Sequence, residues 1–195
     1  MRIVDLTAAL DLREVDSQLA ADEAEQSVDK PVRDILDDVK KRKDQAVCDY
    51  TRRFDEFDLT PDLMRVPEEQ IREYAAGADD DLVDILRRAG DNVRDFHENQ
   101  IEESWEYYAG EGVRLGLRRT PIDSAGIYIP GGKAAYPSSV LMNAIPAQVA
   151  GVERIVVVTP PRSLEENPLV AAALNILNLR EVYRIGGAQA IPLVV

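Results

Sequence analysis

The spacing of hydrophobic residues along this 195-residue chain changes near residue 111. Before that point, apolar residues recur every three or four positions, which is typical of amphipathic helices. After it, short apolar runs alternate with helical periods, which is typical of α/β proteins. We therefore predict a mainly helical region over residues 1–111 and an α/β half over residues 112–195.

Helical patterns cover most of the front region. The first predicted helix begins at a cap formed by Ser27 or Asp29 and has Pro31 in its first turn. A second helix follows the polar break at residues 40–44. A short extended segment at residues 63–66 then leads into a short helix with an acidic first turn.

The longest helical pattern runs from about residue 79 to residue 108, with its apolar residues on one face. Trp105, Tyr107 and Tyr108 are predicted to crowd the end of this helix, where an aromatic cluster usually packs a domain junction. His97 stands at the edge of the apolar stripe. We interpret it as a structural residue, because a lone histidine in such a place is more often hydrogen-bonded than catalytic.

Short apolar runs predict the strands of the second half. A half-exposed strand is predicted at residues 113–117, and further strands at 125–129, 154–159 and 182–185. The run at 154–159 reads as buried because its β-branched residues are unbroken. Helices are predicted between the last three strands, so the order indicates a parallel sheet with crossover helices.

Two glycine pairs follow predicted strands: Gly131 with Gly132, and Gly186 with Gly187. In a parallel sheet both pairs lie at the edge formed by the carboxyl ends of the strands, which we call the mouth of the sheet. Ligands bind at this edge, and glycine there lets the backbone approach them. Hydroxyls of Ser138 and Ser139 can cap the helix that starts there, which suits an anionic group. The spacing fits neither the Rossmann fingerprint nor a Walker loop, so a tight loop without a ligand is an open alternative.

Charge is distributed unevenly along the chain. Asp and Glu number 36 against 23 Lys and Arg, and residues 1–120 hold 31 of the acids with 18 of the bases. The formal charge of −13 repels phosphates and anionic lipids, so neither nucleic acid nor membrane is an expected partner. An acidic, lysine-poor surface is similar to that of proteins from salt-loving organisms; an ordinary acidic cytosolic protein is the alternative.

One cysteine and one histidine limit the chemistry of the chain. Cys48 cannot form an internal disulfide, and together with His97 it cannot supply the roughly four N or S ligands of a closed zinc site. No secretory signal opens the sequence, and no apolar run approaches the roughly eighteen residues of a membrane span. We therefore expect a globular, cytoplasmic protein.

Longer strings are more specific than the glycine pairs. Residues 126–151 include Tyr-Ile-Pro-Gly-Gly and Ser-Ser-Val-Leu-Met-Asn, residues 155–161 read Ile-Val-Val-Val-Thr-Pro-Pro, and residues 186–191 read Gly-Gly-Ala-Gln-Ala-Ile. Together with strings at 50–55, 96–100 and 104–105, they closely resemble the histidinol dehydrogenase family over nearly the whole chain.

The resemblance implies an NAD-dependent, zinc-containing dehydrogenase that oxidises L-histidinol to histidinaldehyde and then to L-histidine. Family members are homodimers with a fold similar to that of aldehyde dehydrogenases. The implied fold here is α/β, a helical N-terminal region followed by an incomplete Rossmann-like parallel sheet with crossover helices, with residues 112–195 as the nucleotide-binding half. Two of the family's dinucleotide contacts map onto Tyr128 and Gln189.

The chain departs from the family in length. Family members are about twice as long, and their zinc ligands, substrate contacts and catalytic Glu-His pair lie beyond residue 195, so no catalytic or metal-binding residue is assigned. The last four residues also differ from the family's alanine-rich helix, which indicates a truncated gene or a fragment. We expect the chain alone to be inactive. The alternative is a non-catalytic remnant that binds nucleotide weakly or pairs with a full-length subunit.

The acidic front region generates a prediction about salt. If its charge reflects a high-salt habitat, raising potassium chloride to molar levels increases the midpoint of thermal unfolding, because salt screens the repulsion between carboxylates. For a chain of this size, each kcal/mol gained raises the midpoint by about 2–4 °C. Scanning calorimetry measures the effect, and a constant or falling midpoint would contradict the high-salt interpretation.

Overall fold

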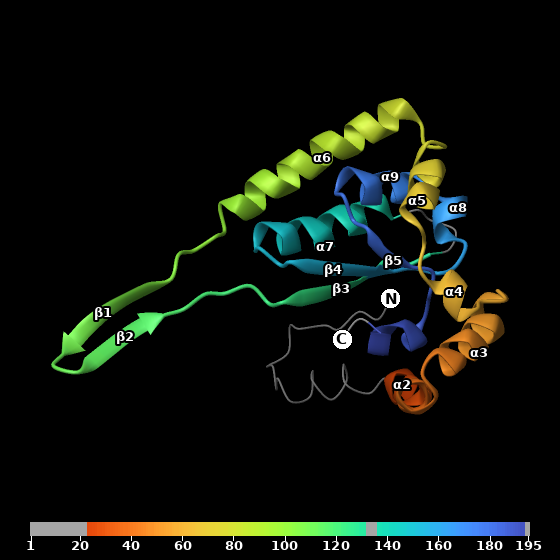
Figure 1. The fold of residues 1–195 in the computed structure, drawn as a ribbon, viewed down its shortest axis with the longest axis horizontal. Coiled ribbons are helices and arrows are strands. Elements are labelled where there is room, and N and C mark those ends of the chain that lie inside the picture. Colours follow the sequence, from red (N-terminus) through yellow and green to blue (C-terminus); the bar gives the residue numbers. More distant parts are fainter. Residues whose placement is uncertain (1–22, 132–135, 194–195) are drawn as a thin grey trace, which may run out of the picture.

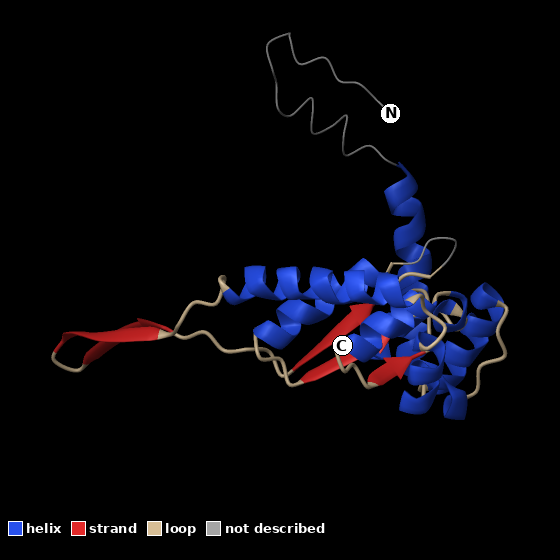
Figure 2. Cartoon of the chain, turned by 90° about the horizontal axis from the view of Figure 1, so that it is seen from above, coloured by secondary structure: helices blue, strands red, loops and turns tan. Residues whose placement is uncertain are grey.

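A computed structural model describes residues 23–131 and 136–193 of the chain. Helices lie on both sides of a small sheet, and a long hairpin projects from one end of this body (Figure 1). The view from above shows the hairpin extending well beyond the helices (Figure 2). Of the glycine pairs, Gly132 lies outside the described residues.

The sheet has three parallel strands in the order β3 (Ser124–Tyr128), β4 (Arg154–Val158) and β5 (Glu181–Tyr183). Their register places Tyr128 beside Val158 and Val158 beside Tyr183, so the carboxyl ends of the strands are level. The helices α7 (Pro137–Val149) and α9 (Pro168–Ile176), with the short α8 (Ser163–Glu166), connect the strands. The predicted α/β order is therefore confirmed.

One hydrophobic core lies between the sheet and the helices drawn above it in Figure 1. The helix α6 (Asp80–Glu98) packs on α7, and α5 (Glu68–Ala75) packs on α9. The acidic first turn of α5 is as predicted. The core includes Ile71, Ile127, Ile145, Val157, Leu174 and Val182.

A second core lies on the other face of the sheet. Val157 belongs to the first core and Val158 to the second, because successive residues of a strand point to opposite faces. The second core is formed by α2 (Glu23–Arg42), α3 (Asp44–Asp55), α4 (Pro61–Met64) and the 3₁₀ helix η1 (Ala188–Leu193). It contains Cys48, whose thiol has a pKa raised by burial, as expected of a structural cysteine.

The predicted start of the first helix is wrong. Ser27 and Asp29 lie inside α2, and Pro31 lies in the interior of the helix rather than in its first turn. The Lys30–Asp34 and Asp29–Arg33 pairs, each at 2.7 Å, support the helix around the proline. The predicted break at 40–44 is confirmed, because α2 ends at Arg42 and Lys43 has a φ of 55°.

The extended segment predicted at residues 63–66 is only half correct. Its first two residues belong to α4, which a proline at the first helical position favours. Met64 and Val66 run beside β5, since the Val66 N–H donates to the Val182 carbonyl at 2.8 Å and the Arg184 N–H donates to the Met64 carbonyl at 2.9 Å.

The helix that the sequence predicts to be longest ends ten residues earlier than expected. The helix α6 stops at Glu98, and Trp105, Tyr107 and Tyr108 belong to β1 (Trp105–Gly110). This strand pairs in antiparallel fashion with β2 (Val113–Leu117), and Gly112 in the turn has a φ of 78°. Aromatic residues favour strands, and the glycine permits the turn.

The predicted boundary at residue 111 falls in the turn of this hairpin. The division of the chain into two domains stays a prediction. None of the helices in the described ranges combines the length and the apolarity needed to cross a bilayer.

The contact between α6 and α7 generates a prediction about stability. Gly90 is buried in the middle of α6, and a Cβ there would lie 3.7 Å from the terminal methyl carbons of Ile145 and Leu141, which is ordinary contact distance. Gly90→Ala should therefore stabilise the fold by about 0.5–1 kcal/mol, because alanine restricts the unfolded chain and favours the helix. Urea unfolding measures this change, and a loss of stability would show that the helices cannot accept the methyl group.

Candidate functional site

The level carboxyl ends of β3, β4 and β5 form the mouth where a parallel sheet places its ligands. From each strand the chain continues into a segment that contains glycine or proline. These segments are residues 129–131, 159–161 and 184–187. The three segments, rather than the strands themselves, therefore shape the candidate site.

The two predicted cofactor residues both lie close to Gly187. The Gly187 N–H donates to the Tyr128 hydroxyl at 3.4 Å, and a Cβ on Gly187 would lie 2.5 Å from Oε1 of Gln189. Gly187 also has a φ of 62°, in the left-handed region that favours glycine. The structure therefore brings Tyr128 and Gln189 together around one residue whose backbone conformation favours glycine.

Gln189 is the second residue of η1 and is completely buried. Neither its Oε1 nor its Nε2 has a hydrogen-bond partner among the described residues. A buried amide without partners is costly, and such groups in folded proteins call for an explanation, for instance a ligand or an ordered water molecule. Tyr128 is 38% exposed, so its ring is open to a ligand from the solvent side.

Pro160 brings the three segments into close contact. A Cβ on Gly131 would lie 2.9 Å from Cγ of Pro160, and a Cβ on Gly186 would lie 3.1 Å from the same atom. The Cβ on Gly186 would also lie 3.3 Å from Oδ1 of Asp55. A side chain at Gly131 would therefore displace the proline ring, one at Gly186 would crowd it, and Asp55 is part of the same site.

Sequence reasoning missed Asp55 as a site residue. It is the last residue of α3, it is partly buried, and desolvation raises the pKa of its carboxyl group. Its Oδ2 is buried without a hydrogen-bond partner in the described part of the chain. The signal that could have found it is the string at residues 50–55, which Asp55 ends.

Further buried hydroxyl groups lie in the segments next to Asp55 and the strand ends. Within residues 23–131 and 136–193, they have no hydrogen-bond partner for their side-chain oxygen. These residues are Thr51 of α3, Thr159 after β4 and Ser163 of α8.

The predicted capping of α7 by serine hydroxyls is wrong. The helix begins at Pro137, the cap position is held by Tyr136, and no side chain caps it. Ser138 and Ser139 lie inside the first turn because proline, with its fixed φ, occupies the first helical position.

His97 lies away from this mouth. It lines a recess of about 320 Å³ at the base of the hairpin, and its Nδ1 lies 2.6 Å from Oε1 of Gln100. Thr120 and Pro121 of the same recess precede β3, so the recess lies toward the amino end of that strand. This hydrogen-bonded position agrees with the structural interpretation of His97.

The described residues contain no group of three or more His, Cys, Asp or Glu side chains that could hold a metal ion. The residues of this chain therefore do not form a fitting zinc site within 23–131 and 136–193.

Comparisons with known proteins agree with the sequence resemblance. The family model described as histidinol dehydrogenase matches residues 19–194. The chain is 50% identical over 167 residues to a histidinol dehydrogenase of Gluconobacter oxydans, covering 86% of this chain and 39% of that protein. It is 50% identical over 165 residues to the Bacillus subtilis enzyme, covering 83% and 38%.

A solved structure gives the same result. The crystal structure of histidinol dehydrogenase from Elizabethkingia anophelis superimposes with a TM-score of 0.76 at 34% identity, covering 98% of this chain and 40% of that one. The chain thus spans about two fifths of the length of the relatives it matches.

Proposed function

This chain belongs to the histidinol dehydrogenase family, and we propose from that premise that it forms the nucleotide-binding part of an enzyme that oxidises L-histidinol to L-histidine with NAD. The observation that carries the proposal is the pairing of Tyr128 and Gln189 around Gly187 at the mouth of the parallel sheet. By itself the chain binds the cofactor and does not turn over substrate, because it holds no assigned base or metal ligand.

The residues at the mouth fit a dinucleotide. Tyr128 offers a partly exposed ring and hydroxyl, and Gln189 offers an amide that can both donate and accept. The glycines at 131, 186 and 187 let the backbone of the strand-end segments pack closely against Pro160 and Gln189, which holds the residues of the mouth in place. When bound, NAD supplies the hydride acceptor of the oxidation. The side chains of this chain hold and orient it.

The proposal predicts weak NAD binding by the isolated chain. A dissociation constant on the order of millimolar, about −4 kcal/mol, is expected because part of a cleft buries little of the ligand. Tyr128→Phe and Gln189→Ala should each reduce the NAD-induced NMR shifts without unfolding the protein, and the shifted amides should include Gly131 and Gly187.

The exposed variant Glu165→Gln serves as a control with unchanged shifts, since Glu165 lies on the surface of α8. Shifts confined to α6 would place the nucleotide elsewhere and contradict the assignment. If the NAD-induced NMR shifts are the same in Tyr128→Phe, Gln189→Ala and wild type, the two side chains only pack within the protein and do not contact the nucleotide.

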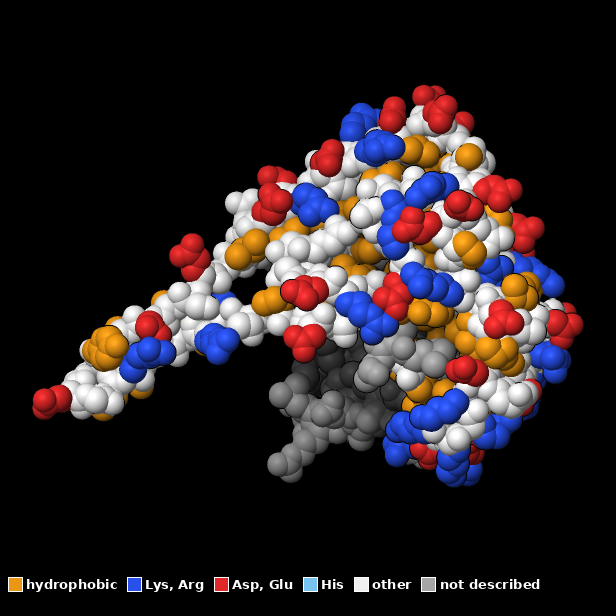
Figure 3. All heavy atoms as spheres, viewed as in Figure 1, with side chains coloured by type: hydrophobic (Ala, Val, Ile, Leu, Met, Phe, Trp, Pro, Cys, Tyr) orange, Lys and Arg blue, Asp and Glu red, His pale blue; other side chains and the backbone are white. Residues whose placement is uncertain are grey.

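A second function, subunit interaction, is favoured by the hairpin. Register places Trp105 opposite Leu117 and Tyr107 opposite Leu115, so these four side chains share one face. Trp105 stacks on Tyr107 with ring centroids 6.2 Å apart. All residues of both strands are exposed, and apolar side chains are visible along the projecting arm in Figure 3.

An isolated two-stranded hairpin is at best marginally stable in water, so this apolar face needs a covering surface. We infer that a second copy of the chain covers it, in line with the homodimer that the family resemblance implies. The proposed binding of NAD does not depend on this contact.

Tyr107→Asp tests the hairpin contact. Burying a charge in an apolar interface is costly, so the substitution should weaken self-association by at least about tenfold, measured by sedimentation equilibrium. Glu106→Gln alters the opposite face of the same strand and should leave association unchanged. A wild-type chain that stays monomeric at the highest attainable concentration would rule out the second copy as the partner.

A further inference from the structure

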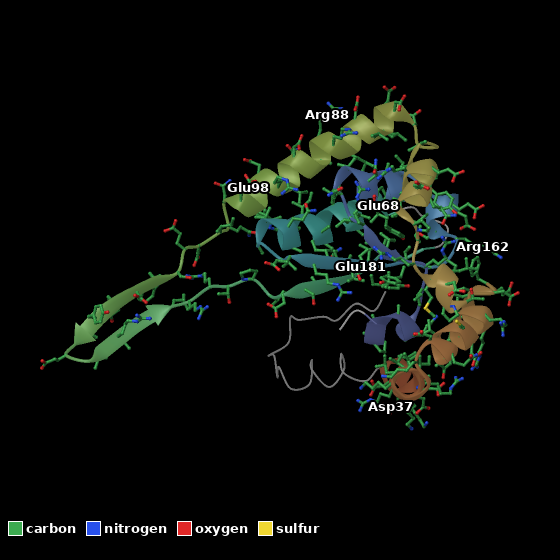
Figure 4. All side chains as sticks on the ribbon, in the orientation of Figure 1. Asp37, Glu68, Arg88, Glu98, Arg162 and Glu181 are labelled. Atoms are coloured by element: carbon green, nitrogen blue, oxygen red, sulfur yellow. The ribbon has the colours of Figure 1, made fainter. Side chains whose placement is uncertain are left out.

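A small recess opens at the carboxyl end of β4, between α3 and α8. Its volume is about 160 Å³, and its lining includes Asp55, Gly131, Pro160, Arg162, Ser163 and Glu166. Figure 4 shows Arg162 on the side of the body away from the hairpin, next to α8. The recess adjoins the predicted cofactor residues, because Asp55 approaches Gly186 and the next residue, Gly187, donates to the Tyr128 hydroxyl.

Ser163 gives the recess a buried polar group. Its side chain is 3% exposed, and its Oγ has no hydrogen-bond partner among the described residues. Its backbone is already engaged, since its N–H donates to the Pro160 carbonyl at 3.0 Å and its carbonyl accepts from Nδ2 of Asn167 at 3.1 Å. The hydroxyl is therefore the group left to bind something in the recess.

The negative charge of the Asp55 carboxylate is unfavourable at its position in the fold. A carboxylate at the last residue of a helix lies near the negative end of the helix dipole. Burial adds a further cost, which raises the pKa of the group, and Oδ2 lacks a partner within the described residues. Groups kept at such a cost are often parts of binding sites.

The chemistry of the lining selects the ligand. A carboxylate can only accept hydrogen bonds, whereas a serine hydroxyl can donate or accept. Asp55 and Glu166 carry two negative charges against the single positive charge of Arg162, so the net charge of the lining disfavours a phosphate in the recess. The volume is below the about 300–1,000 Å³ of pockets for drug-sized ligands. A single uncharged ring with neighbouring hydroxyl groups fits these conditions.

We propose that Asp55 and Ser163 bind neighbouring hydroxyl groups of a ribose ring of the dinucleotide. The inference rests on the proposed function, because the ribose belongs to the cofactor held at Tyr128 and Gln189. An acidic side chain that accepts from ribose hydroxyls is a known device of dinucleotide sites, where it follows a strand. Here the carboxylate comes from the end of α3, and the hydroxyl comes from the segment after β4.

The test is an NMR titration of the full 195-residue chain with NAD, comparing wild type with Asp55→Asn and Ser163→Ala. NAD should shift the amides of Gly131, Ser163 and Gly186, and each substitution should weaken NAD binding at least about tenfold. Glu165→Gln, an exposed acid of the same helix that does not line the recess, should bind NAD as wild type does.

Sugar phosphates identify the group that is recognised. Ribose 5-phosphate should shift the same three amides, and 2-deoxyribose 5-phosphate, which lacks one of the hydroxyls, should bind several-fold more weakly. Equal binding of the two sugars would overturn the proposal. Shifts of these amides by magnesium chloride alone would also overturn it, because the recess would then be a cation site.

Stability separates a binding role of Asp55 from a structural one. Asp55→Asn should leave the thermal midpoint unchanged or raise it, because it removes a charge from the end of a helix; a lower midpoint would indicate a structural role. If NAD shifts Gly187 but binds Asp55→Asn and Ser163→Ala as tightly as wild type, the ribose assignment fails and the proposed function stands. If NAD shifts no amide at the mouth, both fail.

Discussion

The arrangement of the candidate site depends on how closely two backbone segments approach the ring of Pro160. Gly131 and Gly186 come from the ends of the two outer strands, and neither could carry a Cβ without moving the proline. The same approach places Asp55 against Gly186, which joins the end of α3 to the sheet. Because Gly187 follows directly, the contacts of Tyr128 and Gln189 are fixed by the same packing. A shift of the proline would therefore displace all of these groups together.

The two cores hold this arrangement from opposite faces of the sheet. Val157 anchors β4 to the layer of α5, α6, α7 and α9, while Val158 anchors it to α2, α3 and η1. Strand β4 thus lies between the two halves of the body, and the segment that carries Pro160 leaves from its end. Several polar side chains without partners among the described residues, those of Asp55, Thr159, Ser163 and Gln189, belong to the segments around the strand ends.

The parallel sheet could be predicted from the sequence because each of its strands is marked by residues within or directly after the strand itself. Unbroken β-branched residues at 155–159 identify a strand without knowledge of any partner, and the prolines after it and the glycines after the other two strands mark where the strands end. The second strand of the hairpin was predicted at residues 113–117, but the first was misread as helix, because Trp105 and Tyr108 also fit a helical spacing and only the pairing with Val113–Leu117 decides between the two. Asp55 could not be assigned to the site, because its proximity to Gly186 depends on tertiary packing. Tyr128 and Gln189 came from family resemblance, and the structure adds their shared contact with Gly187.

The segment from Met64 to Val66 determines how this sheet can be extended. It takes up hydrogen-bonding groups of β5 and then turns into α5, so a further strand cannot pair along that side. Among the described residues, β3 has no strand on its outer side. Further strands can therefore be added to the sheet on one side only, next to β3. Any strand contributed by a longer relative, or by a second chain, would have to add beside β3, which would carry Tyr128 from the margin of a three-stranded sheet to the centre of a wider one.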